Sequence, residues 1–442
     1  MILFGLPLWL MLMFLFVLGT VVGSFLNVCI YRLPRYESFR RSFQYLIDPP
    51  STCPRCERRI PPLDNIPLIG WVKLRGRCRF CRTPISPRYF FIELLTGVLF
   101  AGLYWCEVPA DYGSSLVDSC IYHPYGPQGA VGSLLLSTVA VVHWRYAYHV
   151  ALVCMLVVAT FIDFDLRIIP DTVTLPAMLV GLLGGCLVGQ VYLVPLWFAE
   201  PGGAFGMSPA DLFWLLRHEP PPDWVFALSG SGGVPGWISR FPRLHGLAVS
   251  LVGLIVGGGV VWAVRIVGHK ALGREAMGFG DVVLMAAIGS FLGWQPTVLV
   301  FFLAPFLAIL VAGTSWLIWR GHELPYGPYL SLATLLVIVF WKPLWPRAAG
   351  ILSLGPLLPV VGLGMLLGLW GLLLGIRSVQ RALGWEPPSE EWETRWSSAD
   401  QLAHYTGEWV DPRQGQWPRR EWPGINSGRG QACEGAWRGK RF

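Results

Sequence analysis

Charged residues are scarce in this 442-residue chain: Asp, Glu, Lys and Arg make up 14% of it, whereas hydrophobic residues make up 54%. The mean hydropathy is +0.51. Soluble globular domains carry roughly 25% charged residues, so this composition excludes that class and indicates a polytopic membrane protein.

Two further absences narrow the interpretation. No basic residue precedes the first apolar run, and that run is longer than the core of a usual signal peptide. We therefore expect residues 1–31 to form a retained anchor. The chain also contains no clear short repeat, so nothing in it supports a repeat architecture.

Apolar runs recur along the whole sequence. Each is close to the ~20 residues that cross the hydrocarbon core of a membrane, so we predict an all-α polytopic membrane protein with about eight to nine transmembrane helices. The runs lie at 2–24, 89–105, 148–163, 172–197, 245–267, 282–293, 296–319, 329–346 and 350–376. The short run at 282–293 is expected to form a tight hairpin with the run that follows it.

The positive charge is concentrated in one segment between two apolar runs. Residues 32–88 contain 13 Lys and Arg against four Asp and Glu, a local net charge of +9. Basic residues favour the cytoplasmic side in short loops, so we place this segment inside. We attribute its charge to topology and expect no nucleic-acid partner. Counting spans from it also places residues 164–171 and 268–281 at the cytoplasmic face.

Four cysteines in this basic segment have the spacing of a metal site. Cys53, Cys56, Cys78 and Cys81 form C-x2-C-x21-C-x2-C. Each C-x2-C pair can present two thiolates from a tight turn, and two such turns complete a tetrahedral zinc site. Two disulfides or a redox motif are the competing interpretations; a reducing cytoplasm disfavours the disulfides, and no βαβ pattern accompanies the pairs. Because four thiolates leave no open coordination position, the predicted Zn²⁺ is structural.

Acidic residues gather where an apolar run ends, in FIDFDLRIIPD. Asp171 follows Pro170 and is expected to cap the next helix. Asp165 is expected to face water or to pair with Arg167. Asp163 lies directly on the apolar run, where an acid is costly and indicates function.

A second acid lies far away in the sequence, in GREAMGFGDVVLM, where Asp281 starts another apolar run. Two carboxylates brought together can share a proton, and such a pair can activate water and protonate a leaving amine. That is aspartic peptidase chemistry. The pattern alone equally fits an ion-coupled transporter or simple helix capping.

Several motifs, in order along the chain, resemble those of the type IV prepilin peptidase family. They are VGSFLNVCIYRLPR (22–35), the two C-x2-C pairs around PPLDNIPLIGWVKLRGRC, PRYFFIELLTGVLF (87–100) with its Glu93, FIDFDLRIIPDTVTLP, AMGFGDVVLMAAIG and LPYGPYLSLA (324–333). The resemblance covers roughly residues 20–345, interrupted at 198–244.

The resemblance implies a membrane aspartic endopeptidase of the bacterial inner membrane, with Asp163 and Asp281 as its catalytic pair. Its partners would be the lipid bilayer and type IV pilin-like or pseudopilin precursors, whose leader it would remove on the cytoplasmic side. It also implies N-methylation of the new N-terminus with S-adenosylmethionine. No Rossmann-type glycine-rich loop is present, so we assign no methyl-transfer residue.

The family often has Lys two residues after the second catalytic acid, where this chain has Val283. An inactive pilus or secretion assembly factor remains an alternative to the peptidase, as does an ion-coupled transporter.

We divide the chain into seven consecutive parts. They are an anchor (1–31), a cytoplasmic zinc-binding loop domain (32–88), a first part of the membrane core (89–197), an exterior insertion (198–244), a second part of the core (245–346), an extra span (347–376) and a cytoplasmic tail (377–442).

Overall fold

The computed structural model describes residues 7–35, 39–47, 50–53, 55–56, 58–108, 138–189, 191–196, 241–272, 277–319, 325–352 and 357–382. Within these ranges the chain forms helices and two isolated β-bridges, and no strand, which confirms the all-α prediction. The chain divides into two compact units. The small unit contains Leu6–Tyr104 and Val153–Thr174, and the large unit contains Trp105–Leu152 and Leu175–Glu386.

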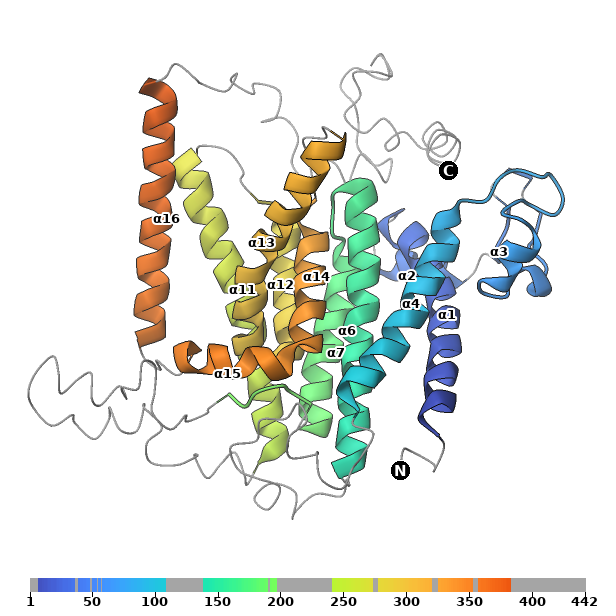
Figure 1. The fold of residues 1–442 in the computed structure, drawn as a ribbon, viewed down its shortest axis with the longest axis horizontal. Coiled ribbons are helices and arrows are strands. Elements are labelled where there is room, and N and C mark those ends of the chain that lie inside the picture. Colours follow the sequence, from blue (N-terminus) through green and yellow to red (C-terminus); the bar gives the residue numbers. More distant parts are fainter. Residues whose placement is uncertain are drawn as a thin grey trace, which may run out of the picture. The chain divides into compact units, whose positions relative to one another are not determined.

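The helices of the small unit are α1 (Leu8–Arg32), α2 (Phe39–Ile47), α3 (Ile69–Lys73), most of α4 (Pro87–Glu107), the end of α6 (Thr138–Leu166) and the start of α7 (Asp171–Val188) (Figure 1). Glycines let α1 and α4 approach closely. A Cβ added at Gly19 of α1 would lie 2.8 Å from the Cα of Gly97 on α4. In a membrane, small residues of this kind allow backbones to pack without a side chain between them.

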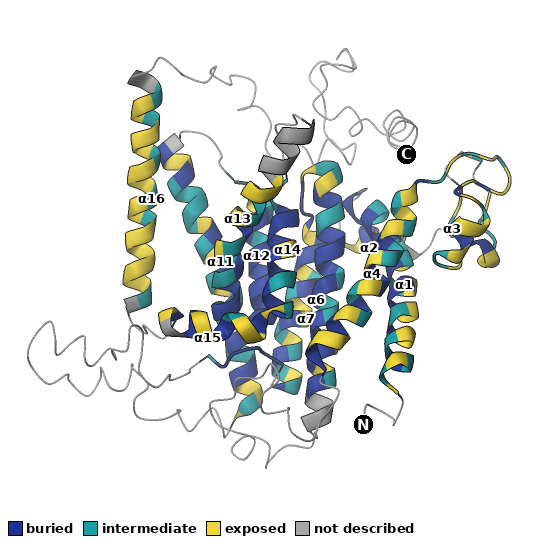
Figure 2. Ribbon diagram, viewed as in Figure 1, coloured by how far each residue is buried: buried dark blue, intermediate teal, exposed yellow. Residues whose placement is uncertain are grey.

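The large unit is built around a short helix. Its elements are the rest of α6 and α7, with α11 (Pro242–Leu272), α12 (Phe279–Leu292), α13 (Trp294–Trp319), α14 (Gly327–Val339), α15 (Trp341–Leu352) and α16 (Leu357–Ala382). Helix α12 contacts α11, α13 and α14 and lies among them in Figure 1. Figure 2 shows α12 as largely buried, and every residue from Leu284 to Leu292 is buried.

Backbone contacts fix α12 against its neighbours. The Tyr148 hydroxyl of α6 donates to the carbonyl of Gly181 on α7 at 2.6 Å and lies 3.1 Å from the carbonyl oxygen of Ser290 on α12. On the other side, a Cβ added at Gly253 of α11 would lie 2.1 Å from the Gly289 carbonyl oxygen. The two backbones therefore touch directly at this crossing.

We expect Gly253→Ala to destabilise the protein by about 1–3 kcal/mol, because the new methyl group can be accommodated only if α11 moves away from α12. The measurement is the midpoint of thermal unfolding of the purified protein in detergent. Gly259→Ala on the same helix is the matched control, since a Cβ there meets no atom within 4 Å. The control should be neutral or slightly stabilising, because Ala has the higher helix propensity. Equal midpoints for the two variants would contradict the close crossing.

In the described residues the apolar runs lie mainly on helices, and the predicted number of about eight to nine spans is confirmed at its lower limit. In the described residues seven helices are long and apolar enough to cross a membrane, or eight if the bent pair α14 and α15 is one span. Helix α12 has only 14 residues, and at ~1.5 Å per residue it is shorter than the ~30 Å hydrocarbon core. The run at 329–346 is not straight either: α14 and α15 meet at 91°.

The sequence explains this bend. Pro343 lies in the first turn of α15, and proline lacks the N–H that would continue the helix from α14. A proline is tolerated in the first turn of a new helix. The chain therefore stops α14 at Val339 and starts a second helix in a new direction.

Most of the proposed extra span (347–376) lies on helix α16, most of whose residues are coloured as exposed in Figure 2. It contacts α11, and Arg377 donates through Nη1 to the Ala271 carbonyl at 3.0 Å. A helix that is apolar and exposed on this scale is suited to face lipid. Most of the predicted exterior insertion (198–244) and of the predicted tail (377–442) lies outside the described residues.

Candidate functional site

The four cysteines lie in two matching turns of the loop between α2 and α4. In each turn the N–H of the first cysteine donates to the carbonyl five residues later, from Cys53 to Arg58 at 3.0 Å and from Cys78 to Thr83 at 2.9 Å. An isolated β-bridge closes each turn. The same local geometry thus presents both pairs of thiols.

The structure brings the four thiols together. The sulfurs of Cys53, Cys56, Cys78 and Cys81 all lie within 4.8 Å of one another, and all four are free thiols. Cys53 Sγ lies 3.7 Å from Cys81 Sγ. A tetrahedral ion with Zn–S bonds of ~2.3 Å requires sulfurs roughly 3.8 Å apart. The donor set and its spacing therefore fit a four-thiolate metal ion.

The thiols differ in how readily they ionise. Burial raises the pKa of Cys53 to about 12. The Thr83 hydroxyl, whose oxygen lies 3.3 Å from Cys81 Sγ, lowers the pKa of Cys81 to about 6. Since metal binding requires thiolates, Cys81 is the cysteine best prepared for the first bond to a metal.

Polar and aromatic contacts fasten this loop to the start of α4. The Trp71 indole N–H donates to the Ile85 carbonyl at 3.2 Å, and its ring lies 5.4 Å from that of Phe90. The Leu68 N–H donates to Glu93 Oε2 at 2.8 Å. Glu93, noted in the sequence only as a motif acid, therefore accepts a hydrogen bond from the loop backbone.

An ion pair inside the loop links its two halves. Arg79 donates through Nε and Nη2 to the two carboxylate oxygens of Asp64. The Arg79 guanidinium holds the pKa of Asp64 below its usual range. Because Arg79 follows Cys78 directly, this pair ties the second cysteine turn to the segment before α3.

Asp163 lies in the last turn of α6, in the small unit. Asp163 is buried, with only 6% of the residue exposed. Its backbone carbonyl accepts the Arg167 N–H at 2.9 Å, and Arg167 has φ of 56°. This left-handed residue ends the helix, so Asp163 is held at the end of an apolar helix, as predicted.

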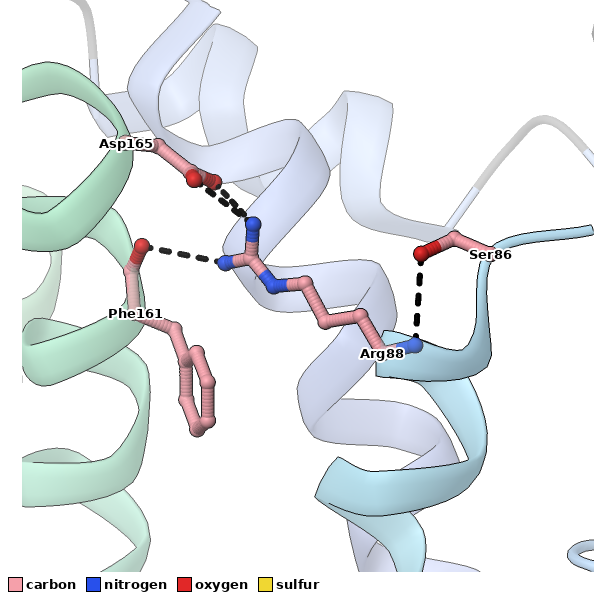
Figure 3. Close-up of polar contacts among 4 residues, drawn as sticks. All are labelled: Ser86, Arg88, Phe161 and Asp165. Atoms are coloured by element: carbon pink, nitrogen blue, oxygen red, sulfur yellow. Dashed lines mark hydrogen bonds and ion pairs between the residues drawn. The ribbon is translucent and has the colours of Figure 1, made fainter. Parts of the chain in front are cut away.

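The sequence did not predict the partner that the structure shows for Asp165. Arg88 Nη1 of α4 lies 2.6 Å from both carboxylate oxygens of Asp165 (Figure 3). The side chains of Arg88 and Asp165 are 26% and 20% exposed. The partner is 77 residues away in the sequence, and it reaches Asp165 because α4 packs beside the end of α6.

Asp171 is exposed and is the first residue of α7, in its first turn. The first turn is completed by the Pro170 carbonyl, which accepts the Val173 N–H at 3.0 Å. A carboxylate in the first turn is stabilised by the positive end of the helix dipole. The structure therefore leaves Asp171 at the helix start, as expected.

Asp281 lies in the first turn of α12, in the large unit, and is 9% exposed. The residues before it are anchored by α11: Arg265 Nε donates to the Met277 carbonyl at 3.1 Å, and its guanidinium lies 5.8 Å from the centre of the Phe279 ring. Asp163 and Asp281 belong to different units.

Tyr326 lies close enough to Asp281 to be affected by its charge, and it was not singled out from the sequence. It immediately precedes α14, and burial together with the charge of Asp281 raises the pKa of its hydroxyl to about 12. The hydroxyl therefore stays protonated beside Asp281. Tyr326 belongs to the motif LPYGPYLSLA, which the sequence pointed to without indicating a role for its tyrosines.

A buried polar contact between α4 and α6 was also missed. Glu107 is the last residue of α4, and its Oε1 lies 2.5 Å from His149 Nδ1 on α6. Both side chains are buried, and Arg145 one turn earlier is 1% exposed.

Comparison with known proteins gives two matched ranges. Residues 17–106 match the Bacterial Peptidase A24 N-terminal domain, and residues 236–313 match the Type IV leader peptidase family. The second range includes Asp281, whereas Asp163 lies outside both. No solved structure matches the chain significantly.

Curated relatives match over most of their length. The chain is 30% identical over 358 residues to a prepilin leader peptidase/N-methyltransferase of Aeromonas salmonicida, which covers 76% of this chain and 92% of that protein. It is 29% identical over 357 residues to the protein of that name from Aeromonas hydrophila, with the same coverage. A third relative of that name, from Neisseria gonorrhoeae, is 28% identical over 347 residues, covering 74% and 90%.

Proposed function

Because this chain belongs to the prepilin leader peptidase/N-methyltransferase family, we propose that it removes the leader peptide of type IV pilin-like or pseudopilin precursors. The observation that carries the proposal is a similarity that spans 92% of a relative with this activity in its name. The buried acid of α12 lies within the matched peptidase range.

We assign hydrolysis to Asp163 and Asp281. Each acid is buried at one end of a helix: the last turn of α6 and the first turn of α12. In the proposed site the two carboxylates share a proton and hold one water. One carboxylate takes a proton from the water as it attacks the scissile carbonyl, and the other protonates the leaving amine. We assign Asp281 as the base, because the N-terminus of α12 favours negative charge there.

The substrate is recognised mainly by its apolar helix. The loop at 32–88 has a net charge of +9, so it does not attract a basic leader. The membrane core proposed at 89–197 and 245–346 offers apolar helices against which the precursor helix packs. We place the protein in the bacterial inner membrane with Asp163, Asp281 and the loop at the cytoplasmic face, where the leader is accessible.

We propose Zn²⁺ as the ion held by Cys53, Cys56, Cys78 and Cys81. Four thiolates fill a tetrahedral ion, so the metal organises the loop and activates no water. We further propose that the enzyme methylates the new N-terminus, with S-adenosylmethionine as the donor. No residue of this chain is assigned to that step.

The proposed function predicts two products from one reaction mixture. Purified protein in detergent, incubated with a pilin-like precursor, should release a product shortened by the leader. With S-adenosylmethionine added, the product should gain the mass of one methyl group at its N-terminus. Intact-mass spectrometry reads both steps. An uncleaved precursor would refute the peptidase, and a shortened product without added mass would refute only the methyltransferase.

A further inference from the structure

Arg88 contacts two residues that lie one turn apart at the end of α6. Its Nη1 contacts both carboxylate oxygens of Asp165 at 2.6 Å, and its Nη2 donates to the Phe161 carbonyl at 3.1 Å. Its guanidinium also lies 5.0 Å from the centre of the Phe161 ring. Figure 3 shows the arginine reaching across from α4 to both residues. Asp163 lies between Phe161 and Asp165 in the same turn.

The end of α6 needs a cation for an electrostatic reason. Its last turn carries two acids, Asp163 and Asp165, next to carbonyls that form the negative end of the helix dipole. Helix α6 has no basic residue in its last turn. Arg88 supplies a positive charge from α4 and engages Asp165.

The start of α4, which carries Arg88, is itself held in place by hydrogen bonds. The Arg88 N–H donates to the Ser86 hydroxyl at 3.2 Å, and Ser86 is buried. Next to Arg88, the Tyr89 carbonyl accepts the Asn27 side-chain N–H of α1 at 3.1 Å. The Trp71 and Glu93 contacts described above fix the same two turns to the cysteine loop. Arg88 is therefore held at the point where the loop and α1 meet α4.

We propose that Arg88 is a positioning residue for Asp163. By binding Asp165 and the Phe161 carbonyl, it fixes the last turn of α6 and with it the direction of the Asp163 carboxylate. This inference rests on the proposed peptidase function. It adds to that function a role for Arg88 and Asp165, in which neither side chain touches the scissile bond.

Steady-state cleavage of the precursor tests this role. Arg88→Gln and Asp165→Asn should each lower kcat by about 10- to 100-fold with KM unchanged, because misplacing a catalytic group by about 1 Å has effects of this size. Arg88→Lys should recover part of the loss, since it restores the charge but not the planar fork that reaches both Asp165 and Phe161. The double variant should be no slower than the slower single variant, because both changes break one contact.

Matched controls separate positioning from general damage. Arg75→Gln removes an exposed arginine of the cysteine loop, and Asp171→Asn removes an exposed acid that follows α6. Both variants should keep the wild-type kcat. Wild-type kcat in Arg88→Gln and Asp165→Asn, additive losses in the double variant, or a raised KM in place of a lowered kcat would overturn the inference.

The inference and the proposed function fail in different ways. If Asp163→Asn is inactive while the Arg88 and Asp165 variants cleave normally, only the positioning role is wrong. If Asp163→Asn itself cleaves normally, the assignment of the catalytic acid is wrong. The unfolding midpoint of each variant, measured in parallel, shows whether a slow variant is also an unfolded one.

Discussion

Asp163→Asn and Asp281→Asn should each lower precursor cleavage by about a thousandfold or more, since in the proposed mechanism each acid transfers a proton in the transition state. Asn matches Asp in size, so both variants should fold. Cleavage rates come from the mass of the product over time, at equal amounts of purified wild type and variant. The double variant should be no slower than either single variant, because the two acids act as one unit.

Asp171→Asn is the control for both substitutions. Asp171 lies eight positions after Asp163 in the sequence but is exposed, in the first turn of α7. It should cleave at the wild-type rate. If Asp163→Asn or Asp281→Asn cleaves as fast as this control, that acid has no catalytic role.

The second large effect concerns the cysteine loop. Cys53→Ser/Cys78→Ser should purify without zinc, because two thiolates of a four-thiolate site are lost. The described loop contains only short helices and two isolated bridges, so the metal must contribute much of its folding free energy. Apparent binding free energies of structural zinc are about 10–16 kcal/mol, comparable with the whole stability of a domain. Limited proteolysis should therefore cut the variant between the loop's two ends.

Metal content by elemental mass spectrometry and the protease pattern together check this expectation. Cys186→Ser is the control, because Cys186 is a free thiol on α7, outside the cluster. It should retain zinc and the wild-type protease pattern. Zinc in the cysteine double variant equal to that of wild type would show that the cluster is not the metal site.

The sequence predicted the helices well because an apolar run near the length of a membrane span has few alternatives. The number of spans was harder to predict, because hydropathy does not distinguish a helix that crosses lipid from one buried among other helices. Helix α12 is the example: it is as apolar as its neighbours, yet it has 14 residues and lies among α11, α13 and α14.

The cysteine site was predictable because its information is local: two C-x2-C turns with repeated backbone hydrogen bonds. The partner of Asp165 was not, because Arg88 reaches it only through the packing of α4 on α6. Sequence proximity suggested Arg167, but that residue adopts a left-handed conformation that ends the helix. Tyr326 was missed for a similar reason, since its neighbour Asp281 is on another helix.

The central proposal is that Asp163 and Asp281 act together as the catalytic pair. The most direct test is cross-linking of Asp163→Cys/Asp281→Cys with a short bifunctional thiol reagent, followed by mass spectrometry of the linked peptides. Asp171→Cys/Asp281→Cys serves as the comparison pair. The account predicts a linked 163–281 peptide in high yield and much less linkage from 171. A monofunctional thiol reagent shows separately whether each cysteine is accessible. If the cysteines at 163 and 281 both react fully with it but are never linked by the bifunctional reagent, the two acids do not share a site.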